Sequence, residues 1–270
     1  MRLSRRAALA VSTVAIAASP VRAAAKAFDA RDPANLLKAY ARMRGGQDGE
    51  LALWYYTANA WAKPADDVAR IVFRVNGLTF QRLTLRADGG IDQKMAGRGF
   101  YGDAVTNAPL DTWTNPFNGE TGTPPHVKSL ALQTVQPGGQ LVLAGEETNR
   151  AYFDGRIADH TVSGDTIWLT ENFVGRGRAE PGRTASTSSS LSTFTAKIAD
   201  VENADLEFVP CYLNYQSLGS WPAWMKMGDR PGQLSWQTWG HKVTGPADGP
   251  KALREWIEAR YPGFLADPGI

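Results

Sequence analysis

The sequence predicts a mainly β protein, built as an antiparallel barrel or a strongly curved sheet with a short N-terminal helix and a short C-terminal helix. The 270 residues include 27 Gly and 16 Pro, which favours many turns. Between these turns lie about ten short apolar segments, spaced roughly 8 to 15 residues apart, as in barrels and sandwiches. Long helical segments do not alternate with them, which argues against a parallel sheet.

Residues 1–25 are predicted to be a signal peptide. Arg5 and Arg6 precede an apolar run at 7–18, and small residues at 23–25 offer a cleavage site. The paired arginines indicate export by the twin-arginine translocation machinery, and therefore a periplasmic or secreted protein. A general secretory signal and an uncleaved anchor remain alternatives. The apolar run is shorter than the roughly 20 residues that span a bilayer, so we expect no stable membrane insertion after cleavage.

The charge balance argues against nucleic acid as a partner. The whole chain carries 29 basic and 27 acidic residues, but residues 1–23 hold four of the arginines and no acid. Removing them leaves 25 basic and 27 acidic residues, a net charge of −2. Such a chain lacks the basic surplus that neutralises phosphates. Cys211, the single cysteine, lies in an apolar run and is expected to be a buried, inert thiol.

Residues 26–49 are predicted to form a linker and a short helix. Asp32 is a good N-cap, and Pro33 suits the first helical position. Leu37, Tyr40 and Met43 recur at helical spacing. We expect this helix to end at the following glycine pair and to pack across an opening of the main body.

Residues 50–270 are predicted to form a single β-rich domain. Strands are expected at 51–61, 95–105, 127–135, 141–145, 149–153, 166–173, 191–201 and 205–213. Two more, at 68–75 and 78–85, flank Asn76-Gly77, a dipeptide that predicts a two-residue hairpin turn. A break in alternation at Gln81-Arg82 suggests a bulge. An amphipathic helix at 251–261 closes the chain.

The segment 220–242 is the main candidate for a binding site. It contains four of the nine tryptophans, among them Trp221 and Trp224, and it includes Met225. We expect Trp221, Trp224 and Met225 to line the mouth of an apolar cavity, with Trp113 as a further aromatic candidate. The alternative is that these side chains only fill a core. In an extended strand Trp236 and Trp239 point to opposite faces, so at most one of them faces a given interior.

Two motifs resemble an uncharacterised bacterial and fungal family. Trp221-Pro222-Ala223-Trp224-Met225-Lys226-Met227-Gly228, followed by Gly232, Gly240 and Lys242, is similar to the signature of the family called domain of unknown function 1838. Residues 113–120, Trp-Thr-Asn-Pro-Phe-Asn-Gly-Glu, resemble its Trp-x-Asn-Pro-x-x-Gly-Glu segment, and Tyr101-Gly102-Asp103 its Tyr-x-Asp. The resemblance covers roughly residues 50–242. It implies a shared fold and no reaction.

The candidate catalytic residues are His241, Glu120 and Glu171. His241 ends the tryptophan-rich segment, and the ordinary pKa of an imidazole suits proton transfer at neutral pH. Glu120 and Glu171 stand beside aromatic residues, and a carboxyl group in an apolar pocket can act as an acid. A structural role for His241 is the alternative.

Two basic residues are candidates for ligand binding. Lys242 follows His241, and Arg98 precedes the Tyr101-Gly102-Asp103 motif, where it can hold an acidic group or pair with Asp103. His126, His160 and His241 lack metal-ligand spacing, so no metal is predicted, although a three-His site built from separate strands remains an alternative. No glycine-rich nucleotide motif follows a strand, and no cofactor is predicted.

These observations predict an exported protein that binds a small, partly apolar or aromatic molecule in an aromatic-lined pocket. It can also be a cofactor-independent enzyme in which His241 and a carboxylate move protons. A non-catalytic module for a lipid-like molecule or a glycan, and a metal-dependent enzyme, are the alternatives.

Overall fold

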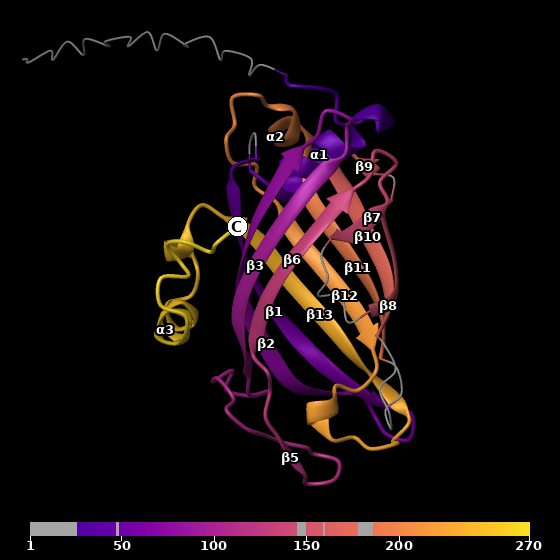
Figure 1. The fold of residues 1–270 in the computed structure, drawn as a ribbon, viewed down its shortest axis with the longest axis vertical. Helices are drawn as coiled ribbons and strands as arrows, with labels where there is room; N and C mark the ends of the chain where they lie inside the picture. Colours follow the sequence, from indigo (N-terminus) through magenta and orange to yellow (C-terminus); the bar gives the residue numbers. More distant parts are fainter. Residues whose placement is uncertain (1–25, 47–48, 145–149, 159, 178–185) are drawn as a thin grey trace, which may run out of the picture.

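A computed structural model describes residues 26–46, 49–144, 150–158, 160–177 and 186–270. The predicted signal peptide at 1–25 lies outside the described residues. Half of the chain is strand, in a nearly closed, barrel-like antiparallel sheet (Figure 1). The predicted fold class is therefore confirmed. Among the described residues, no helix has the length and apolar character needed to cross a membrane.

The barrel wall is one sheet with the strand order β7-β6-β3-β2-β1-β13-β12-β11-β10-β8, and β9 pairs with β10. Its strands are β1 (Leu51–Pro64), β2 (Arg70–Leu85), β3 (Ile91–Gly102), β6 (Val127–Val135), β7 (Leu141–Ala144), β8 (Arg150–Ile157), β9 (Thr161–Ser163), β10 (Thr166–Gly177), β11 (Thr187–Lys197), β12 (Tyr212–Gly219) and β13 (Gly232–Val243). The two edges meet where Ile157 donates a backbone hydrogen bond to Gly139 and Gln140 bridges Arg156. Side chains alternate between the enclosed interior and the outside along every strand.

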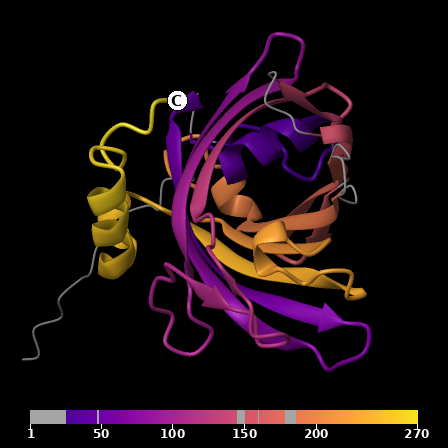
Figure 2. The same ribbon diagram turned by 60° about the horizontal axis from the view of Figure 1, so that its bottom comes forward.

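The N-terminal helix closes one end of the barrel (Figure 2). A turn of 3-10 helix, η1 (Pro33–Asn35), begins where the Asp32 carboxylate accepts a hydrogen bond from the amide of Ala34. It continues into α1 (Leu36–Arg44), which ends at Gly45. Leu37, Tyr40 and Met43 are buried in a core cluster with residues of β10 and β11. The predicted start, end and buried face of this helix are confirmed.

The opposite end is covered by two short segments. The connection between β3 and β6 contains a small hairpin, β4 (Trp113–Thr114) and β5 (Thr121–Gly122), and the connection between β12 and β13 contains the 3-10 turn η3 (Ala223–Met225) (Figure 1). We call this the Trp224 end and the other the α1 end.

The C-terminal helix packs on the outside of the wall. After the 3-10 turn η4 (Pro246–Asp248), α3 (Lys251–Arg260) lies beside the barrel (Figure 2). It buries Leu253, Trp256 and Ile257 against outward side chains of β2 and β3, including Leu78 and Phe80. The predicted helix is confirmed, but it covers a side of the barrel and not an opening.

The predicted hairpin at Asn76-Gly77 is wrong, because β2 runs through both residues and pairs with β1 and β3 along its length. Gly77 faces the barrel interior, where a Cβ atom would lie 2.2 Å from the Tyr56 hydroxyl. The Asn76 amide donates to the Asn107 side chain at 2.7 Å. Gly77 therefore makes room for the ring of Tyr56, and Asn76 holds the loop that contains Asn107.

Other strand predictions also need correction. The bulge expected at Gln81-Arg82 is absent from the regular β1–β2 pairing there, and the register shifts between Ala60 and Trp61 instead. Residues 198–202 form a short helix, α2 (Ile198–Glu202), and 205–211 are not strand. The alternation of apolar and polar residues breaks at Gln81 because this polar residue faces inward. The outward residues of β2 are also buried, under α3 and the C-terminal segment, and are apolar.

Candidate ligand-binding cavity

The interior of the barrel holds a cavity of about 480 Å³, which is partly open to solvent. That volume lies within the range of small-molecule sites in proteins. Eight aromatic side chains, drawn from β1, β3, β8 and β10–β13, contribute to its lining: Trp54, Tyr56, Tyr101, Phe153, Phe173, Phe194, Tyr215 and Trp236. Between them lie small residues, among them Ala58, Ala131 and Ser192, which leave the space open.

At the α1 end the cavity is lined by a buried ion pair. Arg44, the last residue of α1, donates through Nη1 to Oε2 of Glu171 on β10 and to the hydroxyl of Tyr40. The Tyr40 hydroxyl donates in turn to Glu171 Oε2 at 3.0 Å. Arg44 and Glu171 are 7% and 4% exposed, so this pair is held in a nearly dry environment.

Three glutamines surround this pair. Gln81 Oε1 accepts from Arg44 Nε at 2.8 Å, and Gln93, with its amide oxygen towards Arg44, accepts from Nη2 at 2.9 Å. The side-chain amide of Gln133 contacts the side-chain amide of Gln93. We call Tyr40, Arg44, Gln81, Gln93, Gln133 and Glu171 the polar floor.

Burial and charge set the protonation of the polar floor. Burial alone disfavours the Arg44 cation, but Glu171 and Tyr40 outweigh it, and the pKa of Arg44 lies above its usual value. Burial raises the pKa of Tyr40, so its hydroxyl stays protonated and able to donate to Glu171. Burial likewise raises the pKa of Tyr101, further along the cavity, to about 12.

At the Trp224 end of the barrel lies a cluster of aromatic rings packed edge to face or tilted. Trp224 lies 5.2 Å from Phe73, 5.5 Å from Tyr101 and 5.4 Å from Trp113, measured between ring centroids. Trp236 lies 5.9 Å from Tyr101. Such geometries suit the ring quadrupoles. We call Phe73, Tyr101, Trp113, Trp224 and Trp236 the aromatic plug.

The hairpin β4–β5 holds η3 in place against this plug. Asn115, 1% exposed, donates to the carbonyl of Met225 at 2.8 Å, and Asn118 donates to the carbonyl of Lys226 at 2.8 Å. A Cβ atom on Gly122 would lie 1.8 Å from the carbonyl oxygen of Trp224. The two motifs singled out in the sequence, 113–120 and 221–228, are therefore one structural unit.

The predicted ligand-binding aromatic residues lie in or beside the plug. Trp113 is buried and donates through Nε1 to the carbonyl of Val72 at 3.0 Å. Met225 is fully buried, and Trp221 donates to the carbonyl of Arg230 at 2.8 Å. Trp224 packs against Tyr101, which lines the cavity, but it is not itself among the described lining residues. Trp236 faces inward and Trp239 is 42% exposed, as the strand argument predicted.

The three predicted catalytic residues are not brought together. Glu171 lines the cavity. His241 lies on the outward side of β13, with its ring 5.6 Å from that of Tyr55. Glu120 is exposed in the β4–β5 hairpin at the other end of the barrel (Figure 1).

The two basic candidates are placed outside the cavity. Lys242 is buried beside the end of α1, where Nζ donates to the carbonyls of Arg42 and Gly45 at 3.0 and 2.8 Å. Burial lowers the pKa of Lys242 to about 8. Arg98 lies on the outside of β3, with its guanidinium 4.4 Å from the ring centre of Phe264.

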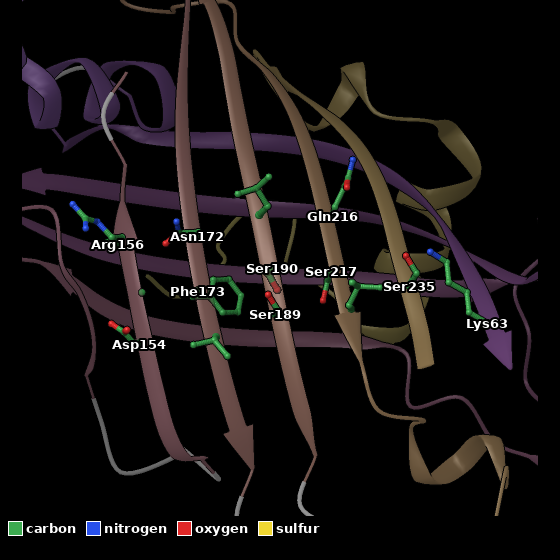
Figure 3. Close-up of a pocket in the computed structure, with 14 residues that line it drawn as sticks. Lys63, Asp154, Arg156, Asn172, Phe173, Ser189, Ser190, Gln216, Ser217 and Ser235 are labelled. Carbon is green, nitrogen blue, oxygen red and sulfur yellow. The ribbon is translucent and has the colours of Figure 1, made fainter. Parts of the chain in front are cut away.

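A second hollow, of about 470 Å³, lies along β8 and β10–β13 (Figure 3). Its labelled side chains are mostly polar, among them Asp154, Arg156, Asn172 and Gln216. Among the described residues, Phe173 is the one aromatic residue in its lining, whereas eight line the interior cavity. The interior cavity is the better candidate for an apolar ligand.

Within the described residues, no group of three or more His, Cys, Asp or Glu side chains is placed to hold a metal ion. His126 lies beside Trp256 of α3, with ring centroids 4.9 Å apart, whereas His241 lies beside Tyr55 of β1. Cys211 is buried, and burial raises the pKa of its thiol to about 12, as expected for an inert thiol.

Sequence reasoning missed most of the polar floor. Arg44, Gln81, Gln93 and Gln133 gave no local motif, because they come from one helix and three strands. One signal was present: each glutamine sits at an inward position of a long strand. A polar residue at such a position indicates a polar network or a site.

Fold and cavity together define a barrel-like β protein with an aromatic-lined interior cavity that has a charged pair at one end. Comparison with protein-family models gives the family. The model of DUF1838, described as a protein of unknown function, matches residues 49–269, so the chain belongs to this family. A comparison with curated proteins gives no match.

Proposed function

We propose that the protein binds a small, partly apolar molecule with an aromatic part inside its barrel. The observation that carries this is the cavity of about 480 Å³ with eight aromatic side chains in its lining. Apolar walls with a few polar groups at one end are the usual composition of small-molecule sites, because the walls supply affinity and the polar groups fix orientation.

We propose binding as the function and assign no proton transfer to the predicted trio. Of these three residues only Glu171 lines the cavity, while His241 and Glu120 lie outside it. A general base must reach the proton that it removes, directly or through one water molecule. Neither His241 nor Glu120 meets this condition for a ligand in the barrel.

The test uses 1-aminoanthracene, an uncharged aromatic probe whose fluorescence rises in an apolar environment. We expect saturable binding to the mature protein, and loss of that binding in Ala131→Phe, because Ala131 lines the cavity and the larger side chain fills it. Leu132→Phe is the matched control, since Leu132 is the next residue on β6 and is 41% exposed. Absence of saturable binding, or equal binding by both variants, would overturn the proposal.

We further propose that the protein is exported by the twin-arginine machinery to the periplasm or beyond. The support is the order of Arg5-Arg6, the apolar run and the small residues at 23–25. Replacing both arginines by lysine is expected to leave the protein in the cytoplasm of a bacterial host, measured by cell fractionation. Continued export of this variant would indicate the general secretory route.

A further inference from the structure

Arg44 is the only cation that lines the cavity in the described part of the chain, and its donors are already used. A guanidinium has five N–H groups. Nε donates to Gln81, and Nη1 donates to Tyr40 and Glu171. Nη2 donates to Gln93 and contacts the sulfur of Met95 at 3.1 Å. Four of the five N–H groups therefore go to oxygen acceptors and the fifth to a weakly accepting sulfur, so none is left without a partner for the carboxylate of a ligand.

Glu171 is different, because half of its carboxylate is unused. Both hydrogen bonds that it accepts, from Arg44 and from Tyr40, go to Oε2. Within the described part of the chain, Oε1 accepts no hydrogen bond, although Glu171 is 4% exposed and lines the cavity. Oε1 itself is not fully buried, so a donor on a ligand in the cavity can reach it and form a hydrogen bond to a charged acceptor.

We propose that the polar floor selects a neutral ligand with a hydroxyl or amide donor, and rejects a carboxylate. The hydroxyl or amide group of the ligand donates a hydrogen bond to Glu171 Oε1, and the apolar part of the ligand lies among the aromatic side chains. A carboxylate would meet an anionic oxygen at close range in a medium of low dielectric constant, with no free cation to offset the repulsion. This inference rests on the proposed function, since it concerns the same cavity.

The test is competition with bound 1-aminoanthracene by three compounds of one shape: 2-naphthol, 2-naphthoate and naphthalene. At neutral pH the first is a neutral donor, the second an anion, and the third has no polar group. We expect 2-naphthol to bind at least roughly tenfold more tightly than 2-naphthoate, the size of one hydrogen bond to a charged group. It should also bind more tightly than naphthalene.

Glu171→Gln provides the second arm. It removes the anionic oxygen and leaves Arg44 without its counter-charge, so the affinity for 2-naphthoate should rise. The ratio of the affinities for 2-naphthol and 2-naphthoate should therefore fall by roughly tenfold or reverse. Arg98→Gln is the control, because Arg98 lies on the outside of the barrel and its loss should leave the ratio unchanged. If Glu171→Gln does not fold, the three-compound series on the native protein decides.

The outcomes separate the two proposals. If 1-aminoanthracene itself does not bind, the proposed function fails. If the probe binds and 2-naphthoate displaces it as well as or better than 2-naphthol, the cavity binds ligands but the donor-selective floor is wrong. If Glu171→Gln leaves the affinity ratio of 2-naphthol to 2-naphthoate unchanged, the role given to Glu171 is also wrong.

Discussion

The two ends of the barrel interior carry opposite kinds of side chain. At the α1 end Arg44 and Glu171 form a buried ion pair within a network of hydrogen bonds, and at the Trp224 end five aromatic rings pack against each other. The stability of the first end depends on charge complementarity, since a charge that loses its partner is left in an apolar environment. The second depends on contact area and shape. The two ends should therefore respond differently to substitution.

The largest effect is expected at the polar floor. Glu171→Ala leaves the Arg44 guanidinium buried without its carboxylate, and we expect the free energy of unfolding to fall by about 3 to 5 kcal/mol. Chemical denaturation of the purified mature protein measures this. The double variant Arg44→Met with Glu171→Leu should recover much of the loss, because neither charge then remains. A single variant that loses less than about 1 kcal/mol would contradict the account of this end.

A smaller effect is expected at the aromatic plug. Gly122→Ala places a methyl group against the carbonyl of Trp224, so hairpin β4–β5 and η3 must separate, at a cost of about 1 to 3 kcal/mol. Gly138→Ala is the matched control, since a Cβ atom there meets nothing within 4 Å. Equal stability of the two variants in thermal unfolding would show that the hairpin does not lock η3.

The effect that is smallest at neutral pH concerns Lys242, which lies outside the cavity and binds the carbonyls of Arg42 and Gly45 at the end of α1. Its folded-state pKa of about 8 lies below the ordinary 10.5, so between these pH values the unfolded chain holds this proton while the folded chain has released it. Stability contributed by Lys242 should therefore rise with pH, by up to about 1.4 kcal/mol per pH unit.

Lys242→Met removes this titration and serves as the comparison. The difference in unfolding free energy between native protein and variant should grow in favour of the native protein as the pH rises above 8. A difference that stays constant with pH would mean that Lys242 is not held in a desolvated site.

The same contrast explains what the sequence revealed. Part of the aromatic plug is visible in the sequence, because Trp224 and Trp236 lie in one tryptophan-rich segment and the second motif at 113–120 carries Trp113. The barrel class was also predictable, since turns and short apolar segments are local properties. Both predictions needed only residues close together in the chain.

The polar floor was not predictable in this way. Arg44 and Glu171 are separated by 127 residues, and their meeting depends on how α1 enters the barrel. Lys242, expected as a ligand contact, caps a helix because inward positions near the α1 end of β13 face α1 and not the cavity. The pattern at Gln81 wrongly predicts a bulge because both faces of β2 are buried, which removes the polar-out pattern.

The most direct measurement is a crystal structure of the mature protein with 6-bromo-2-naphthol, located by the anomalous scattering of bromine. We predict one bromine site inside the barrel, on the side of the aromatic plug. The naphthol hydroxyl should then lie within hydrogen-bond distance of Glu171 Oε1. A ligand bound only in the hollow on β8 and β10–β13, or one inside the barrel with its hydroxyl turned away from the polar floor, would contradict it.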